Sequence, residues 1–214
     1  VERQILKPKA QPLATRQETI LFPGVELRLK VPGQKGFHVG HIFEGPFDPR
    51  NLPPNGRQLT LGELTEFIRQ YPGITTPNHP LMGLSSDYRG RPTKSHVGRT
   101  VCELLETGLF DAMELLNGGM LTDPDIEVER TIATIKLGIA MQRFLARKGI
   151  TLALTGGSDA HEAEDIGLCA TLYPDDMDLF EAIQTGNTHP AILNPPEWLE
   201  QKIEPLEKWI YQMD

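Results

Sequence analysis

Apolar and polar positions alternate over short stretches in the first third of the chain. Residues 25–31 (Val-Glu-Leu-Arg-Leu-Lys-Val) carry an apolar side chain at every second position, which is typical of a half-buried strand. Further strands are predicted at 19–22, 37–43 and 74–76. Proline, asparagine and aspartate are frequent in residues 45–56, so we expect a loop there.

Helices are predicted where start signals precede a periodic apolar pattern. Thr60 and Glu63 form a capping-box pattern, and the helix behind it is expected to reach about Gln70. Residues 124–147 give the clearest helical period, with Asp123 as the expected N-cap and a proline at the first position.

The remaining elements alternate between strand and helix. Helices are expected at 96–107 and 176–185, and strands at 111–116, 150–154 and 169–172. This alternation favours an α/β architecture with a mostly parallel sheet or barrel. We predict one domain over 1–214, with a helical tail at 196–214.

Composition narrows the class of protein. The chain has 214 residues, of which 39% are apolar and 23% charged, so a globular domain is expected. The net charge of -8 argues against a general nucleic-acid binder, and no apolar stretch is long enough to span a membrane. Cys102 and Cys169 lie too far apart for a thiolate zinc finger, which favours a reducing, cytoplasmic setting.

Potential metal ligands recur at or after the predicted strands. They are Glu26, His41, His79, Asp159 and His161. Carboxylates and imidazoles together suit zinc, manganese or iron, and no thiolate is needed. Since the ends of parallel strands meet at one mouth of an α/β fold, these side chains are expected to converge there.

The ordered motifs resemble those of the PHP (polymerase and histidinol phosphatase) superfamily. The matching segments are Phe22–Glu26, the strand 37–43, Asn78–Pro80, Asp111–Gly118, Gly157–His161 and Ile166–Gly167. The resemblance covers residues 19 to about 190. It implies a distorted (β/α)7 barrel and, in active members, two or three divalent metal ions (Zn, Mn or Fe) at its mouth.

The resemblance also implies roles for individual residues. Glu26 would bridge metals, and His79, Asp159 and His161 would be further ligands. His41 is preferred as the histidine ligand of the second strand because it directly precedes Ile-Phe. His38 is the alternative, and only one of the two can serve, since residues three apart on a strand face opposite sides.

Weaker assignments concern the surroundings of the site. Glu114 and Asn117 are expected to support the ligands from behind. Arg89, Arg91 and Lys94 follow His79 in a loop and are candidates for binding substrate phosphate.

One part of the family pattern is absent. The family begins with a His-x-His strand and a Thr-Asp-His turn, and this sequence contains neither. Because the first residue is Val1, we expect a piece of a longer protein that lacks the first barrel strands; a degenerate relative is the other interpretation.

Two classes of function follow from these residues. The first is a metal-dependent hydrolase, a phosphoesterase acting on a phosphorylated small molecule or nucleotide with metal-activated water. The alternative is a catalytically inactive PHP-like module with a binding or regulatory role.

Overall fold

The structure is a computed structural model that describes residues 22–31, 37–81, 96–123, 126–193 and 195. The strands are β1 Gly24–Leu29, β2 Phe37–Phe43, β3 Gln58–Leu59, β4 Gly73–Pro77, β5 Ala112–Asn117, β6 Ala153–Gly157, β7 Cys169–Leu172 and β8 His189–Ile192. The helices are α1 Leu61–Gln70, α3 His96–Leu105, α4 Gly118–Thr122, α5 Val128–Arg147 and α6 Leu179–Gln184, with short 3-10 turns at Pro49–Asn51 and Ala163–Asp165.

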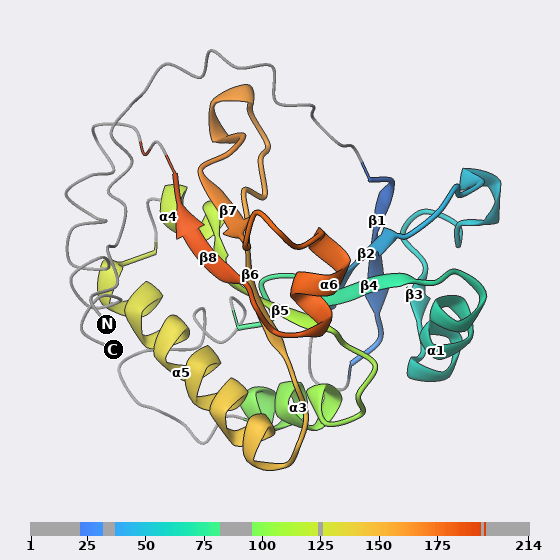
Figure 1. The fold of residues 1–214 in the computed structure, drawn as a ribbon, viewed down its shortest axis with the longest axis horizontal. Helices are drawn as coiled ribbons and strands as arrows, with labels where there is room; N and C mark the ends of the chain where they lie inside the picture. Colours follow the sequence, from blue (N-terminus) through green and yellow to red (C-terminus); the bar gives the residue numbers. More distant parts are fainter. Residues whose placement is uncertain (1–21, 32–36, 82–95, 124–125, 194, 196–214) are drawn as a thin grey trace.

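The described strands form three sheets rather than a closed barrel. One sheet has four strands in the order β3-β1-β2-β4, and β5-β6 and β7-β8 are two-stranded sheets. The sheets adjoin, because β4 lies beside β5 and β6 lies beside β7 (Figure 1). The predicted (β/α)7 barrel is therefore wrong for this part of the chain.

The antiparallel pairing of β1 with β2 explains the difference. Only the residues 30–36 separate these two strands, whereas a crossover between parallel strands needs a dozen or more. β2 also pairs antiparallel with β4, and β7 pairs antiparallel with β8. Within these sheets, parallel pairing is limited to β5 with β6 and β1 with the short β3.

Helices cover the strands from two ends. α3 and α5 lie along one side of the central strands, and α1 lies beside β3 at the other end (Figure 1). α1 begins with the predicted capping box: Thr60 accepts from the backbone N–H of Glu63, and the Glu63 carboxylate accepts from the N–H of Thr60.

The main hydrophobic core lies under β1 and β2. In β2 the side chains of Phe37, Val39, His41 and Phe43 are buried, and those at the alternate positions are half-buried. Leu27 and Leu29 of β1 belong to the same core. Each fully buried aliphatic or aromatic side chain of this kind stabilises the fold by about 1.5–3 kcal/mol.

Several element boundaries differ from the predictions. α5 begins at Val128, and Asp123, the expected N-cap, is the C-cap of α4. β6 starts at Ala153, three residues later than expected, and β8 was not predicted. Of the predicted strand at 19–22 only Phe22 is described, and it lies outside any strand; residues 19–21 and the predicted helical tail at 196–214 lie outside the described residues.

Candidate metal centre

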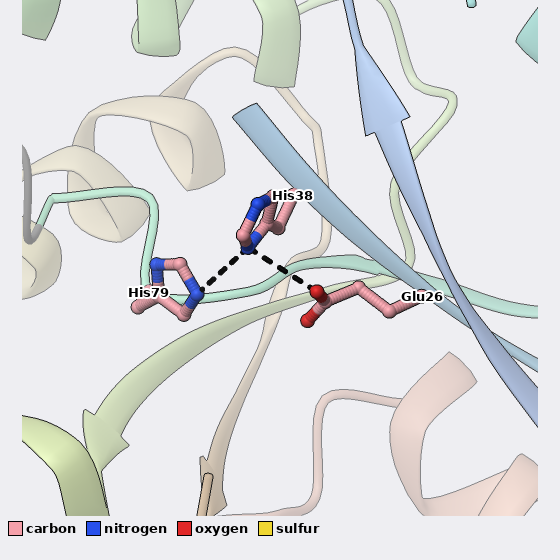
Figure 2. A group of neighbouring side chains, drawn as sticks. All are labelled: Glu26, His38 and His79. Carbon is pink, nitrogen blue, oxygen red and sulfur yellow. Dashed lines mark hydrogen bonds and ion pairs between the residues drawn. The ribbon is translucent and has the colours of Figure 1, made fainter. Parts of the chain in front are cut away.

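Glu26 and His38 share the face of the β1-β2 pair that is turned away from the core. The register places Glu26 opposite Gly40 and Arg28 opposite His38, so Glu26 and His38 are diagonal neighbours. His38 Nδ1 lies 3.2 Å from Glu26 Oε1 (Figure 2). The Glu26 side chain is 47% exposed, which leaves this side of the pair open to solvent.

His79 reaches the same point from the end of β4. Its Nε2 lies 3.2 Å from His38 Nδ1, and the two rings meet edge to face (Figure 2). The His79 backbone has a φ of 33°, a left-handed value that is uncommon for a residue other than glycine. Burial lowers the pKa of His79, which favours a neutral ring with a free nitrogen lone pair.

Two imidazole nitrogens and one carboxylate oxygen therefore converge. One ligand atom from each of Glu26, His38 and His79 lies within 4.8 Å of the others. His38 Nδ1 carries at most one hydrogen, and it faces two atoms that can accept it, His79 Nε2 and Glu26 Oε1. A divalent cation would satisfy all three lone pairs together, so the donor set fits a metal ion.

Asn78 follows the last residue of β4 and supports Glu26 of β1 from the far side of β2. Its Nδ2 donates to Glu26 Oε2 at 2.9 Å, which leaves Oε1 directed at His38. Gly40 makes room for this amide, because a Cβ at Gly40 would lie 2.7 Å from Asn78 Oδ1. The sequence motif at Asn78–Pro80 predicted a role for His79 and none for Asn78.

Glu114 lies behind His79. Its Oε2 accepts from the backbone N–H of His79 at 2.5 Å and from Asn117 Nδ2 at 3.1 Å. Burial raises the pKa of Glu114 to about 7, and the charges of Asp159 and Glu26 act in the same direction. The carboxyl thus contacts the backbone of a candidate ligand, and it does not belong to the three-residue cluster.

Asp159 and His161 follow β6 and lie outside the three-residue cluster. Asp159 has a φ of 47°, and a Cβ at Gly119 would lie 3.0 Å from its Oδ2. Its charge raises the pKa of His79, so its carboxylate faces the same region. His161 is exposed, and its Nδ1 bonds the Asp159 carbonyl at 2.9 Å.

His41 lies in the core, on the opposite face of β2 from His38. Its Nε2 donates to the Tyr71 carbonyl at 2.9 Å, because a carbonyl can only accept, and its Nδ1 therefore accepts from the Thr75 hydroxyl at 2.9 Å. The preference for His41 over His38 is corrected by this geometry. Both ring nitrogens of His41 are already used, and only His38 faces Glu26 and His79.

The strand pattern contained the signal for His38. Positions 37, 39 and 43 are Phe, Val and Phe. Since every second residue of a strand faces the same side, position 41 faces the core with them and position 38 faces away from it. The phosphate-binding candidates Arg89, Arg91 and Lys94 lie outside the described residues.

Comparison with known protein families gives a match to one part of the chain. Residues 142–188 match the family model described as PHP-associated. This segment runs from the end of α5 to the residue before β8 and contains Asp159 and His161. It supports a relation to PHP proteins.

Other comparisons are more distant. The chain is similar to the crystal structure of PsfC from Pseudomonas syringae PB-5123, with 19% identity and a TM-score of 0.48. The similarity covers 90% of this chain and 66% of that one, so the chain spans just under two thirds of its length. No curated protein matches the chain. Among the described helices, none has both the length and the apolar character needed to cross a bilayer.

Proposed function

We propose that this chain belongs to a metal-dependent hydrolase of the phosphoesterase class, related to PHP proteins. The observation that carries the proposal is the convergence of Glu26 Oε1, His38 Nδ1 and His79 Nε2. The three residues come from β1, β2 and the end of β4, so the folded sheet is needed to bring them together.

The donor set favours zinc, manganese or iron over calcium or magnesium, since two of the three donors are imidazole nitrogens. Three protein ligands with an exposed side are also typical of a catalytic rather than a structural metal site. A bound divalent cation would supply a water molecule of lowered pKa and polarise a phosphoryl oxygen.

The chain's own residues hold the site ready for such an ion. Burial lowers the pKa of His79, which favours the neutral ring that a metal ion needs as a ligand. Asn78 fixes one oxygen of Glu26 and thereby aims the other. The open side at Glu26 would admit a phosphorylated small molecule or nucleotide, and the net charge of -8 disfavours long nucleic acids. We propose a cytoplasmic location.

A second candidate is a PHP-like module that binds a metal ion without turnover. One observation favours it: His161 is exposed, its Nδ1 bonds the Asp159 carbonyl, and it is not part of the three-residue cluster. On this proposal the cation would stabilise the sheet or a partner surface.

Metal titration with two probe esters distinguishes the candidates. Metal-free protein is titrated with Zn²⁺, Mn²⁺ and Fe²⁺ by calorimetry, and hydrolysis of para-nitrophenyl phosphate and bis(para-nitrophenyl) phosphate is measured. Glu26→Gln should lose binding and turnover, whereas the exposed Glu129→Gln on α5 should retain both. Binding without hydrolysis supports the module. A wild-type chain that binds none of the three ions contradicts both candidates.

A further inference from the structure

We propose that Glu114 is a positioning residue that sets the backbone at His79 and so directs its ring at Glu26 and His38. The proposal is supported by the hydrogen bond of 2.5 Å that the His79 N–H donates to Glu114 Oε2. It links β5 to the end of β4, across the boundary between two sheets. The proposal rests on the cation site of the proposed function and adds the device that holds it in shape.

The segment around His79 has few other ways to fix its backbone. Pro77 and Pro80 have no N–H, so only Asn78 and His79 can donate. The Asn78 N–H bonds the His38 carbonyl at 3.0 Å and continues the β2-β4 pairing. The His79 N–H is left to Glu114, at the residue where φ is positive.

The positive φ makes this hydrogen bond important. A left-handed residue other than glycine persists only where its surroundings fix it, and the proline after His79 restricts the backbone further. Without the Glu114 carboxyl, the peptide could relax to negative φ. The ring of His79 would then swing away from His38 Nδ1.

Glu114 is itself held from two sides. Asn117 Nδ2 donates to the same Oε2, and Asn117 Oδ1 accepts from the Met120 N–H at the start of α4. Glu114 Oε1 lies against the Cα of Gly157 in β6, where any larger residue would displace it. A chain of contacts therefore runs from α4 through Asn117 and Glu114 to the candidate ligand His79.

Two conservative variants separate hydrogen-bond reach from charge. Glu114→Gln removes the charge but keeps an oxygen at the same distance from the His79 N–H. Glu114→Asp keeps the charge but shortens the side chain by one methylene. If position matters, Gln should behave like wild type and Asp should not.

The first measurement uses Co²⁺ as a spectroscopic probe for the full chain. Glu114→Asp is expected to weaken Co²⁺ binding by about 10- to 100-fold and to change its visible absorption, as loss of an outer contact to a metal ligand commonly does. Glu114→Gln is expected to keep the wild-type spectrum and an affinity within about threefold of wild type. The reverse order would show that charge and not reach is responsible, and equal loss in both variants would show that reach alone does not explain the role of Glu114. Either result would overturn the proposal.

The second measurement needs no metal. Long-range ¹H–¹⁵N NMR spectra of the metal-free protein report the environment of each imidazole, and the buried His41 is an internal reference for an intact core. Glu114→Asp should shift the His79 and His38 signals and leave those of His41 in place. Unchanged His79 signals in Glu114→Asp overturn the positioning role. If wild type binds no Co²⁺, the proposed function fails, and this measurement still decides the role of Glu114.

Discussion

His41 donates from Nε2 to the carbonyl oxygen of Tyr71 at 2.9 Å, and this bond ties β2 to the residue that ends α1. Phe43 and Phe67 pack edge to face against the same ring. His41 is therefore a core residue of the sheet, whereas His38, three positions earlier on the strand, belongs to the candidate metal centre.

The two histidines should give opposite phenotypes. His38→Ala is expected to weaken Zn²⁺ or Mn²⁺ binding by more than about 100-fold, more than the loss of an outer contact costs, with a small change in stability. His41→Ala is expected to cost about 2–4 kcal/mol, since it leaves a buried cavity and unpaired polar groups. Calorimetric titration and urea unfolding of both variants test this, and a His41→Ala chain that is stable but metal-free would contradict it.

Stability should depend on pH through His41. Burial lowers the pKa of His41, more than the Tyr71 carbonyl and the nearby Asp111 charge raise it. The unfolded chain then binds the proton more readily, so the His41 contribution is complete above about pH 6.5 and is lost as the pH falls toward the lower folded pKa.

The measured quantity is the difference between wild type and His41→Gln. The free energy of unfolding in urea of wild type minus that of His41→Gln should rise with pH up to about 6.5 and then stay level. Using the difference removes contributions of the opposite sign, such as that of Glu114, whose pKa is raised by burial. A difference that is constant from pH 5 to 8 would show that His41 does not titrate in this way.

The sequence predicted individual elements better than their arrangement. Local signals identified β2 at its correct bounds and α1 with its capping box. The barrel prediction failed because strand pairing depends on contacts far apart in sequence, here the antiparallel β1-β2 and β2-β4 pairs. Asp123 was misassigned because the proline that follows it, interpreted as a helix start, also disfavours a helical residue before it, and Asp123 is the extended C-cap of the short α4.

The candidate site was also predictable only in part, because some of its contacts join residues far apart in sequence. Glu26 and His79 could be identified from the motifs. The alternation of core-facing and outward-facing positions along β2 also indicated His38 in place of His41. Asn78 could not be identified, since its role depends on the 2.9 Å hydrogen bond to Glu26, which joins the end of β4 to β1 past the intervening β2. No local pattern encodes a contact of that kind.

Gly40→Ala should disturb the site without unfolding the sheet. The new methyl group would meet Asn78 Oδ1, the end of a side chain that can move aside. The Asn78 hydrogen bond to Glu26 should be lost and metal affinity should fall by about 10-fold.

A double-mutant cycle checks this explanation. Asn78→Ala alone should give a similar loss, and Gly40→Ala combined with Asn78→Ala should add little to it, because both act through one contact. Additive losses in the double variant would mean that Gly40 acts on the sheet itself.

Cys169 should be inert in the native protein. It lies buried in β7, and burial raises the pKa of its thiol to about 12, so about one thiol in ten thousand is ionised at pH 8. In a Cys102→Ser chain, a thiol reagent such as iodoacetamide is expected to label Cys169 only after urea is added. Mass spectrometry after timed exposure measures this. Complete labelling within minutes in native buffer would show that β7 opens readily, and the sheet edge beside Ser158 and Asp159 would then be far less rigid than its hydrogen bonds indicate.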